Sequence, residues 1–182
     1  ARYSLFVGNY SDALSAANLV NLSTKSIFNY NTITLNPIFS IAASTNNVYQ
    51  PTDSNLGLPA GIQPDPSDAR LPFYLSTNAI APIYRIKGFF NTSTGSIPVY
   101  LPGEMTLIKA EAYARLNDLP NALIQLNIVV TKSPSSDPFG IGANLPPTSY
   151  TDQNDLLNKI YKNRCIELYM SGLKLIDERR FN

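Results

Sequence analysis

Residues Glu104 to Val130 read EMTLIKAEAYARLNDLPNALIQLNIVV. Apolar side chains recur in this stretch at the three- and four-residue spacings of an amphipathic helix. The pattern is interrupted at Asn117-Asp118, two residue types that favour turns, and it resumes at Leu119. We therefore predict two helices that are joined by a short turn and packed against each other as a hairpin.

The first twenty residues repeat this arrangement. When Asn117 is aligned with Gly8, 109 positions earlier, Ala122 falls on Ala13. A small residue at a fixed place after the turn lets two helices pack closely, as in tetratricopeptide repeats. Residues 1–20 are therefore predicted to form a second helical hairpin. Because three repeats are usually needed to bury a continuous core, two alone do not predict an independent solenoid.

Local residue types also predict where individual helices begin and end. Gly8 suits the left-handed residue that ends the first helix, and Ser11 or Asp12 is expected at the cap or in the first turn of the second. A further helix is predicted from about 152 to 170, with Thr151 as its candidate cap. A break and a short final helical segment follow it.

The residues between the two hairpins, 21–103, contain nine of the 14 prolines of the chain. Proline interrupts both helices and central strands, so most of this part is predicted to form irregular loops. Short extended segments or strands are expected at 37–41, 83–86 and 97–100, where apolar runs lie between breakers.

The composition argues against several classes of function. Lys and Arg total 14 against 13 for Asp and Glu, without long runs of like charge, which disfavours nucleic-acid binding. Histidine is absent, so neither a Ser-His-Asp triad nor a Cys-His pair can form. The single cysteine, Cys165, lies in the predicted 152–170 helix and is expected to pack as a small apolar side chain.

Residues Asn158 to Asn182 read NKIYKNRCIELYMSGLKLIDERRFN. This stretch and the stretch from Glu104 to Val130 resemble two motifs of the SusD/RagB family, E-x-x-L-I-x-A-E-A-Y-A-R-L-G-D and I-x-x-E-R-x-x-E-L-x-x-E-G-x-R-x-x-D-L-R-R. The matching residues are Glu104, Leu107, Ala110, Glu111, Asp118, Arg164, Glu167, Leu168, Gly172, Asp177, Arg179 and Arg180. The departures are Asn163 for an acid, Ser171 for Glu, Lys174 for Arg and Glu178 for an apolar residue.

This resemblance implies a mainly α fold of tetratricopeptide-like hairpins with long irregular loops, a fragment of the SusD-like α-α superhelix. It implies one domain fragment over 1–182, divided into the hairpin 1–20, the loop-rich excursion 21–103 and the C-terminal signature region 104–182. A preceding portion that carries the signal, the lipidated cysteine and other helical hairpins is expected to lie outside this chain.

The function that the resemblance implies is the binding of a nutrient, above all an oligosaccharide, at the bacterial cell surface. The protein would be an outer-membrane lipoprotein that delivers its ligand to a SusC-like TonB-dependent transporter. No enzymatic activity, catalytic residue, cofactor, metal or nucleic-acid partner is expected. The alternative is a protein–protein interaction scaffold whose helices bind a partner and no small ligand.

The signature carboxylates allow two interpretations. A catalytic role would require a carboxyl group with a raised pKa, whereas pairing with arginine lowers a carboxyl pKa. We therefore expect these side chains to form structural ion pairs; they are Glu104, Glu111, Glu167 and Asp177, with Arg164, Arg179 and Arg180. The aspartates of the loops, Asp65, Asp68 and Asp137, are expected to form turns rather than a glycosidase or calcium site.

The candidate ligand-binding residues lie in the loops from Asn46 to Tyr100. Aromatic rings can stack on the apolar face of a sugar, and amides or Arg can bond its hydroxyl groups. From the aromatic and polar residues of these loops we select five as ligand-binding, each of which could instead serve packing: Tyr49, Arg70, Tyr74, Tyr84 and Tyr100.

Overall fold

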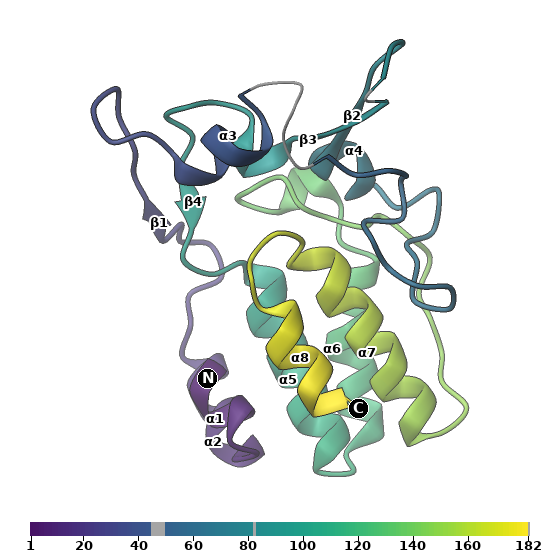
Figure 1. Ribbon diagram of the computed structural model, residues 1–182. Coiled ribbons are helices and arrows are strands. Elements are labelled where there is room, and N and C mark those ends of the chain that lie inside the picture. Colours follow the sequence, from purple (N-terminus) through teal and green to yellow (C-terminus); the bar gives the residue numbers. More distant parts are fainter. Residues whose placement is uncertain (45–49, 82, 182) are drawn as a thin grey trace.

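The chain is built mainly from helices, as the sequence predicted, with loops and short strands gathered at one end of the long helices (Figure 1). The computed structural model describes residues 1–44, 50–81 and 83–181. Its helices are α1 (Arg2–Phe6), α2 (Tyr10–Asn18), α3 (Pro37–Ala42), α4 (Leu71–Tyr74), η1 (Gly88–Phe90), α5 (Pro102–Arg115), α6 (Leu119–Val130), η2 (Pro134–Ser136), α7 (Gln153–Glu167) and α8 (Lys174–Phe181). Its strands are β1 (Ile27–Phe28), β2 (Leu75–Thr77), β3 (Tyr84–Ile86) and β4 (Ile97–Pro98).

The two predicted hairpins, α1–α2 and α5–α6, are confirmed and share one turn geometry. Gly8 and Asn117 both have positive φ, at 78° and 63°. The next residue in each turn, Asn9 or Asp118, donates its backbone N–H to a carbonyl five residues earlier. The same residue then caps the following helix with its side chain. A left-handed residue followed by a capping side chain therefore builds both hairpins.

Helix caps lie slightly before or after the positions expected from the sequence. Asn9 is the cap of α2, and Asp12 lies in its first turn, one of the two positions expected for it. Asp152 replaces Thr151 as the cap of α7, where its side chain accepts a bond from the backbone N–H group three residues later. Both caps are Asn or Asp, whose short side chains reach a free N–H group of the first turn.

The segment 37–41, expected to be extended, forms helix α3 instead. The side chain of Asn36 accepts hydrogen bonds from the backbone N–H groups of Ile38 and Phe39, at 2.9 and 3.1 Å. Pro37 suits the first helical position because its fixed φ is already helical and no N–H group is needed there. The strands predicted within 83–86 and 97–100 are present, as β3 paired with β2 and β4 paired with β1, both antiparallel.

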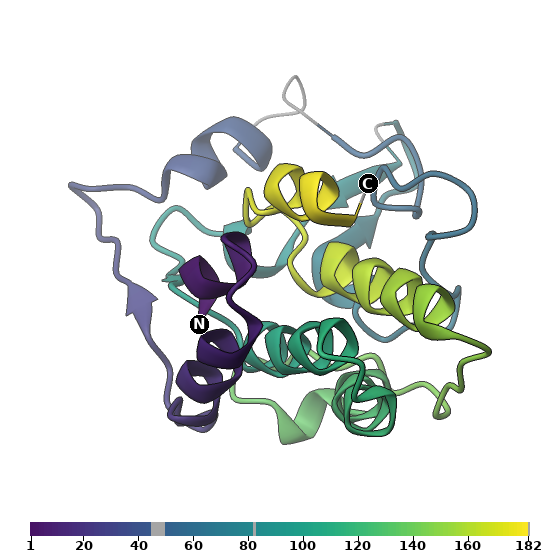
Figure 2. The same cartoon turned by 90° about the horizontal axis from the view of Figure 1, so that it is seen from below.

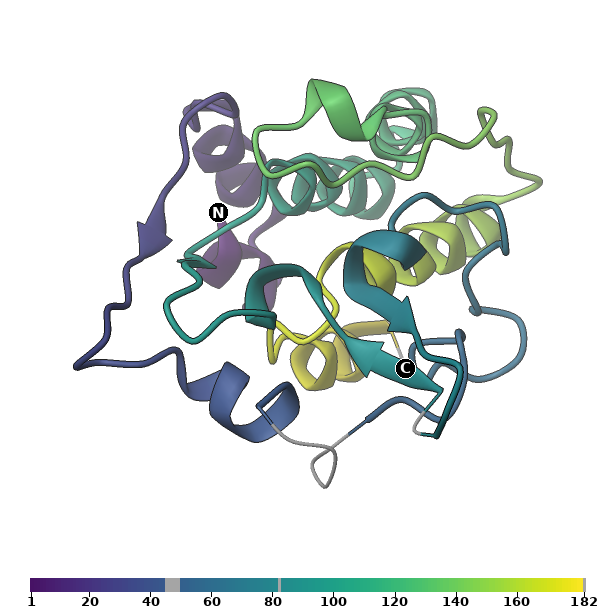
Figure 3. The ribbon, with the colours of Figure 1, turned by 90° about the horizontal axis from the view of Figure 1, so that it is seen from above.

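Helix α5 is the centre of the fold. Eleven of its fourteen residues are buried, and it contacts α2, α6 and α7. Figure 2, seen from below, shows α5 between the α1–α2 hairpin and α7, with α6 beside it. Figure 3 shows the opposite end, where the segments between α2 and α5 lie across the ends of the long helices.

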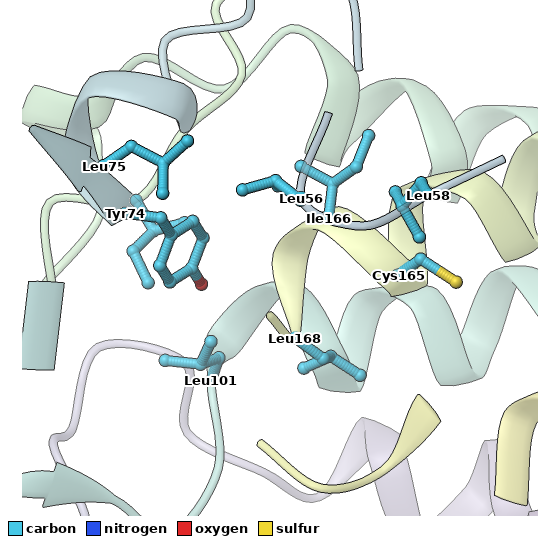
Figure 4. Packing of buried hydrophobic residues seen from close by; sticks show 9 residues of the cluster. Leu56, Leu58, Tyr74, Leu75, Leu101, Cys165, Ile166 and Leu168 are labelled. Atoms are coloured by element: carbon cyan, nitrogen blue, oxygen red, sulfur yellow. The ribbon is translucent and has the colours of Figure 1, made fainter. Parts of the chain in front are cut away.

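An apolar cluster joins these loops to the C-terminal end of α7. Figure 4 shows Leu56 and Leu58, from the loop before α4, next to Cys165 and Ile166 of α7. All four side chains are buried, Ile166 completely. Cys165 therefore packs as a small apolar residue, as predicted, and burial raises the pKa of its thiol.

Candidate ligand-binding site

Two groups of buried charges lie beneath the loops and between the helices. In the first, Arg70 Nη2 lies 2.6 Å from Asp68 Oδ2, and Arg70 Nη1 lies 3.2 Å from Glu167 Oε2. Lys132 Nζ lies 2.7 Å from Asp137 Oδ2 and 3.1 Å from Glu167 Oε1. Burial acts to lower the pKa of Arg70, but its bonds to Asp68 and the charge of Glu167 outweigh this and raise it. The group ties the loop before α4 to α7.

The second group joins α5, α7 and α8. Arg164 Nη2 lies 2.8 Å from Asp177 Oδ1, and Arg180 Nη2 lies 2.9 Å from both Asp177 Oδ1 and Glu111 Oε2. Arg179, expected in such pairs, is exposed on α8. The signature carboxylates are thus held in ion pairs, which agrees with the structural interpretation of these residues.

A cavity of about 390 Å³ opens between the α1–α2 hairpin, the β1–β4 strand pair and the turn after α7. We call it the aromatic cavity because seven of its lining residues carry aromatic rings: Phe28, Tyr30, Tyr74, Phe89, Phe90, Tyr100 and Tyr169. Their exposure is graded, from 1% for Tyr74 and 3% for Phe90 to 57% for Phe28. The cavity therefore has a buried aromatic floor and an open aromatic rim, and its volume falls within the range of about 300–1,000 Å³ that is usual for small-molecule sites.

An ion pair forms the polar part of this cavity. Arg2 donates to both carboxylate oxygens of Glu104 at 2.7 Å, and its Nη2 also donates to the carbonyl of Val99 at 3.1 Å. Glu104 is 1% exposed, whereas the Arg2 side chain is 32% exposed. The hydrogen bonds to Glu104 raise the pKa of Arg2, so the guanidinium group stays charged.

Tyr74 lines the cavity, and both its hydroxyl group and its ring contact other residues of the protein. The hydroxyl group donates to the backbone carbonyl of Glu167 at 2.6 Å. The ring packs edge to face against Phe73 and Tyr169, with centroids 4.9 and 5.5 Å apart. Burial raises the pKa of Tyr74 well above its ordinary value, which keeps the hydroxyl group neutral.

The five predicted ligand-binding residues are placed in different environments. Tyr74 and Tyr100 line the aromatic cavity. Arg70 is 1% exposed and its guanidinium group bonds to side chains of the protein interior. Tyr84 is half-buried in β3 and packs against the apolar cluster shown in Figure 4. Tyr49 lies outside the described residues.

Several lining residues were not among the candidates selected from the sequence. Phe28 and Tyr30 precede the 46–100 loops. Arg2 belongs to the first helical hairpin, and Tyr169 lies within the second family motif. The sequence offered one sign of these missed residues. Phe28 and Tyr30 are two aromatic residues close together in a segment without proline, 21–36.

A second cavity, of about 690 Å³, lies between the beginning of α5, the end of α6 and η2. It contains no aromatic ring among its described lining residues, and its polar groups are hydroxyl groups together with Lys132 and Asp137.

No cluster of three or more metal-binding side chains is found across 1–44, 50–81 and 83–181. None of the described helices combines the length and hydrophobicity needed to span a bilayer.

The fold is that of the SusD-like proteins. The chain superposes on a SusD-like carbohydrate-binding protein of Bacteroides vulgatus with a TM-score of 0.65 over 97% of this chain, at 20% identity. It matches a SusD superfamily protein of Bacteroides thetaiotaomicron with a TM-score of 0.58 over 98% of this chain, at 17% identity. It spans 42% and 47% of those two proteins. No protein-family model matches the sequence, and a search of curated proteins gives no match.

Proposed function

We propose that the chain is one domain fragment of a SusD/RagB-type lipoprotein that binds an oligosaccharide at the outer-membrane surface and delivers it to a SusC-like TonB-dependent transporter. The observation that carries this proposal is the aromatic cavity, whose lining includes seven rings and one ion pair. Sugar rings combine apolar faces with hydroxyl groups and therefore suit a site of this composition. The fold shared with a solved SusD-like carbohydrate-binding protein supports it.

In this proposal the five candidate residues have different roles. Tyr74 and Tyr100 border the ligand, and Arg70 positions the loop that carries Tyr74. Tyr84 supports the floor through the apolar cluster, and Tyr49 remains a proposed contact. Catalysis is not part of the proposal, because a glycosidase requires two carboxyl groups across the cleft. The described lining of the aromatic cavity has a single carboxylate, Glu104, which is paired with Arg2.

The test is calorimetric titration of the full-length protein with a panel of oligosaccharides. Saturable binding is expected, and Tyr30→Ala should weaken it roughly tenfold because one stacking surface is lost. Tyr3→Ala is the matched control, since Tyr3 is 84% exposed and lies outside the cavity lining. No binding by the unmodified protein, or equal losses in the two variants, would contradict the proposal.

A protein–protein scaffold is the second candidate, favoured by apolar side chains exposed on the outer face of α6. Ile124 and Ile128, one helical turn apart, are 55% and 48% exposed. A scaffold would lose its protein partner when both are changed to Asp and would keep it in Tyr30→Ala. The protein and its variants can be purified from the outer membrane, and the amount of partner that is recovered with each can be compared. The proposed SusC-like transporter is the first partner to look for.

A further inference from the structure

The aromatic cavity carries no net charge. Among the described residues that line it, Arg2 and Glu104 are the charged ones, and each neutralises the other. The remaining polar groups of the lining are hydroxyl groups and backbone atoms. A ligand that enters the cavity therefore meets one neutral ion pair and a wall of aromatic rings.

The geometry of the pair determines what it can offer to a ligand. Nε and Nη2 of Arg2 both bond the Glu104 carboxylate, and Nη2 also bonds Val99 O. Nη1 takes no part in these three bonds, and the side chain is 32% exposed, so it can donate to a ligand hydroxyl group. Arg2 thus can bond an uncharged ligand without leaving its carboxylate.

An acidic ligand would compete with Glu104 for Arg2. Its carboxylate would have to share Arg2 with Glu104, whose side chain is 2% exposed. Two carboxylates around one guanidinium group repel each other, and releasing Glu104 would leave a buried charge without its partner. Glu104 also lies in the first turn of α5, where the helix dipole stabilises a negative side chain and holds it in place.

We infer that the aromatic cavity selects uncharged sugar residues and discriminates against uronic acids, and that the Arg2–Glu104 pair sets this selectivity. The inference rests on the proposed function, because it names the chemical class of the oligosaccharide bound there. Arg2 and Glu104 are then specificity-determining residues: Arg2 bonds hydroxyl groups, and Glu104 cancels the charge that would attract an anion.

The first experiment compares matched ligands on the full-length protein by calorimetry. The probes are gluco-, manno- and galacto-oligosaccharides of about six residues, each with a form in which the C6 hydroxymethyl groups are oxidised to carboxylates. We expect at least one neutral probe to bind roughly tenfold or more tightly than its oxidised form. Equal or tighter binding of the oxidised form overturns the inference and leaves the proposed function standing. No binding of any probe overturns both.

The second experiment removes the negative charge of Glu104. Glu104→Gln keeps the shape of the side chain but leaves Arg2 as an uncompensated cation, so the ratio of the two Kd values should shift roughly tenfold toward the oxidised probe. Glu178→Gln is the matched control, because Glu178 is exposed on α8 and lies outside the cavity lining. A shift of the same size in both variants overturns the inference, and the comparison of matched ligands stands independently if Glu104→Gln does not fold.

Discussion

Two regions of the molecule differ in which side chains they bury. One is the set of helices α5, α7 and α8, and the other is formed by the loops between α2 and α5. Between the helices, charged groups such as Glu111, Arg164 and Asp177 are almost fully buried and face opposite charges. In the loops, aromatic rings such as Phe28 and Tyr100 remain partly exposed around a cavity. Buried ion pairs fix one arrangement of the helices, whereas half-exposed rings provide surface for a ligand.

The two regions are nevertheless connected at Glu167. Its carboxylate lies between Arg70, from the loops, and Lys132, which follows α6, while its backbone carbonyl accepts from Tyr74. One residue of α7 therefore fixes both a loop and an aromatic ring of the cavity floor. The buried charges of the helices and the rings of the cavity therefore meet at one junction, Glu167, and they meet again at Glu104, whose ion pair with Arg2 lines the cavity.

The largest expected effect comes from breaking the junction. Arg70→Met should lower the free energy of unfolding by about 3–5 kcal/mol, because Asp68 and Glu167 would stay buried with their charges unpaired by Arg70. Urea unfolding followed by circular dichroism measures this change. Arg179→Met, on the exposed side of α8, is the control, and similar losses in the two variants would show that the junction is not stabilising.

The next largest effect is expected where Gly103 of α5 packs closely against Glu167 of α7. Gly103→Ala should destabilise the protein by about 1–3 kcal/mol, because the added Cβ would overlap the Glu167 carboxylate. In an exposed helix the same change stabilises by up to about 1 kcal/mol, so the sign of the effect is decisive. An increase in the midpoint of urea unfolding would show that Glu167 does not pack against Gly103.

A smaller effect on stability is expected at the rim of the aromatic cavity. Phe28 is 57% exposed, so Phe28→Ala should change the free energy of unfolding by less than about 0.5 kcal/mol. Oligosaccharide affinity should fall roughly tenfold in the same variant. Urea unfolding and calorimetry on one preparation give both values, and a loss of stability comparable with that of Arg70→Met would mean that the rim belongs to the core.

The smallest effect is a pH dependence on the solvent-exposed side of α7. Lys159 Nζ and the Thr151 N–H group bond Asp155 at 2.8 and 2.9 Å and lower its pKa. A lowered carboxyl pKa stabilises the folded state above the ordinary value of about 3.9, and this stabilisation is lost as the pH falls through the folded-state pKa. Asp155→Asn should therefore lower the Tm slightly near about pH 6 and leave it unchanged near about pH 2. Equal shifts at both pH values would argue against a charge effect.

Local rules account for the part of the fold that the sequence predicted well. The two hairpins follow from apolar spacing and from a left-handed residue next to a capping side chain, all within a few positions of Gly8 and Asn117. The error at α3 has the same scale: the prolines of 21–103 predicted irregular structure, although Asn36 at the cap and Pro37 at the first position begin a helix. Dipeptides of this kind specify a boundary without specifying which side of it is helical.

The sequence by itself determined the helical class, the repeated turn, the short strands β3 and β4, and the pairing of the signature carboxylates with basic side chains. Only the tertiary structure decided which residues share a cavity, because Arg2, Phe28, Tyr100 and Tyr169 meet there from four distant parts of the chain. It also decided that Arg70 is buried while Phe28 is exposed. Helix periodicity and capping depend on neighbours a few residues away, whereas burial and charge balance in a cavity depend on contacts between segments whose sequence separation encodes nothing about their distance in space.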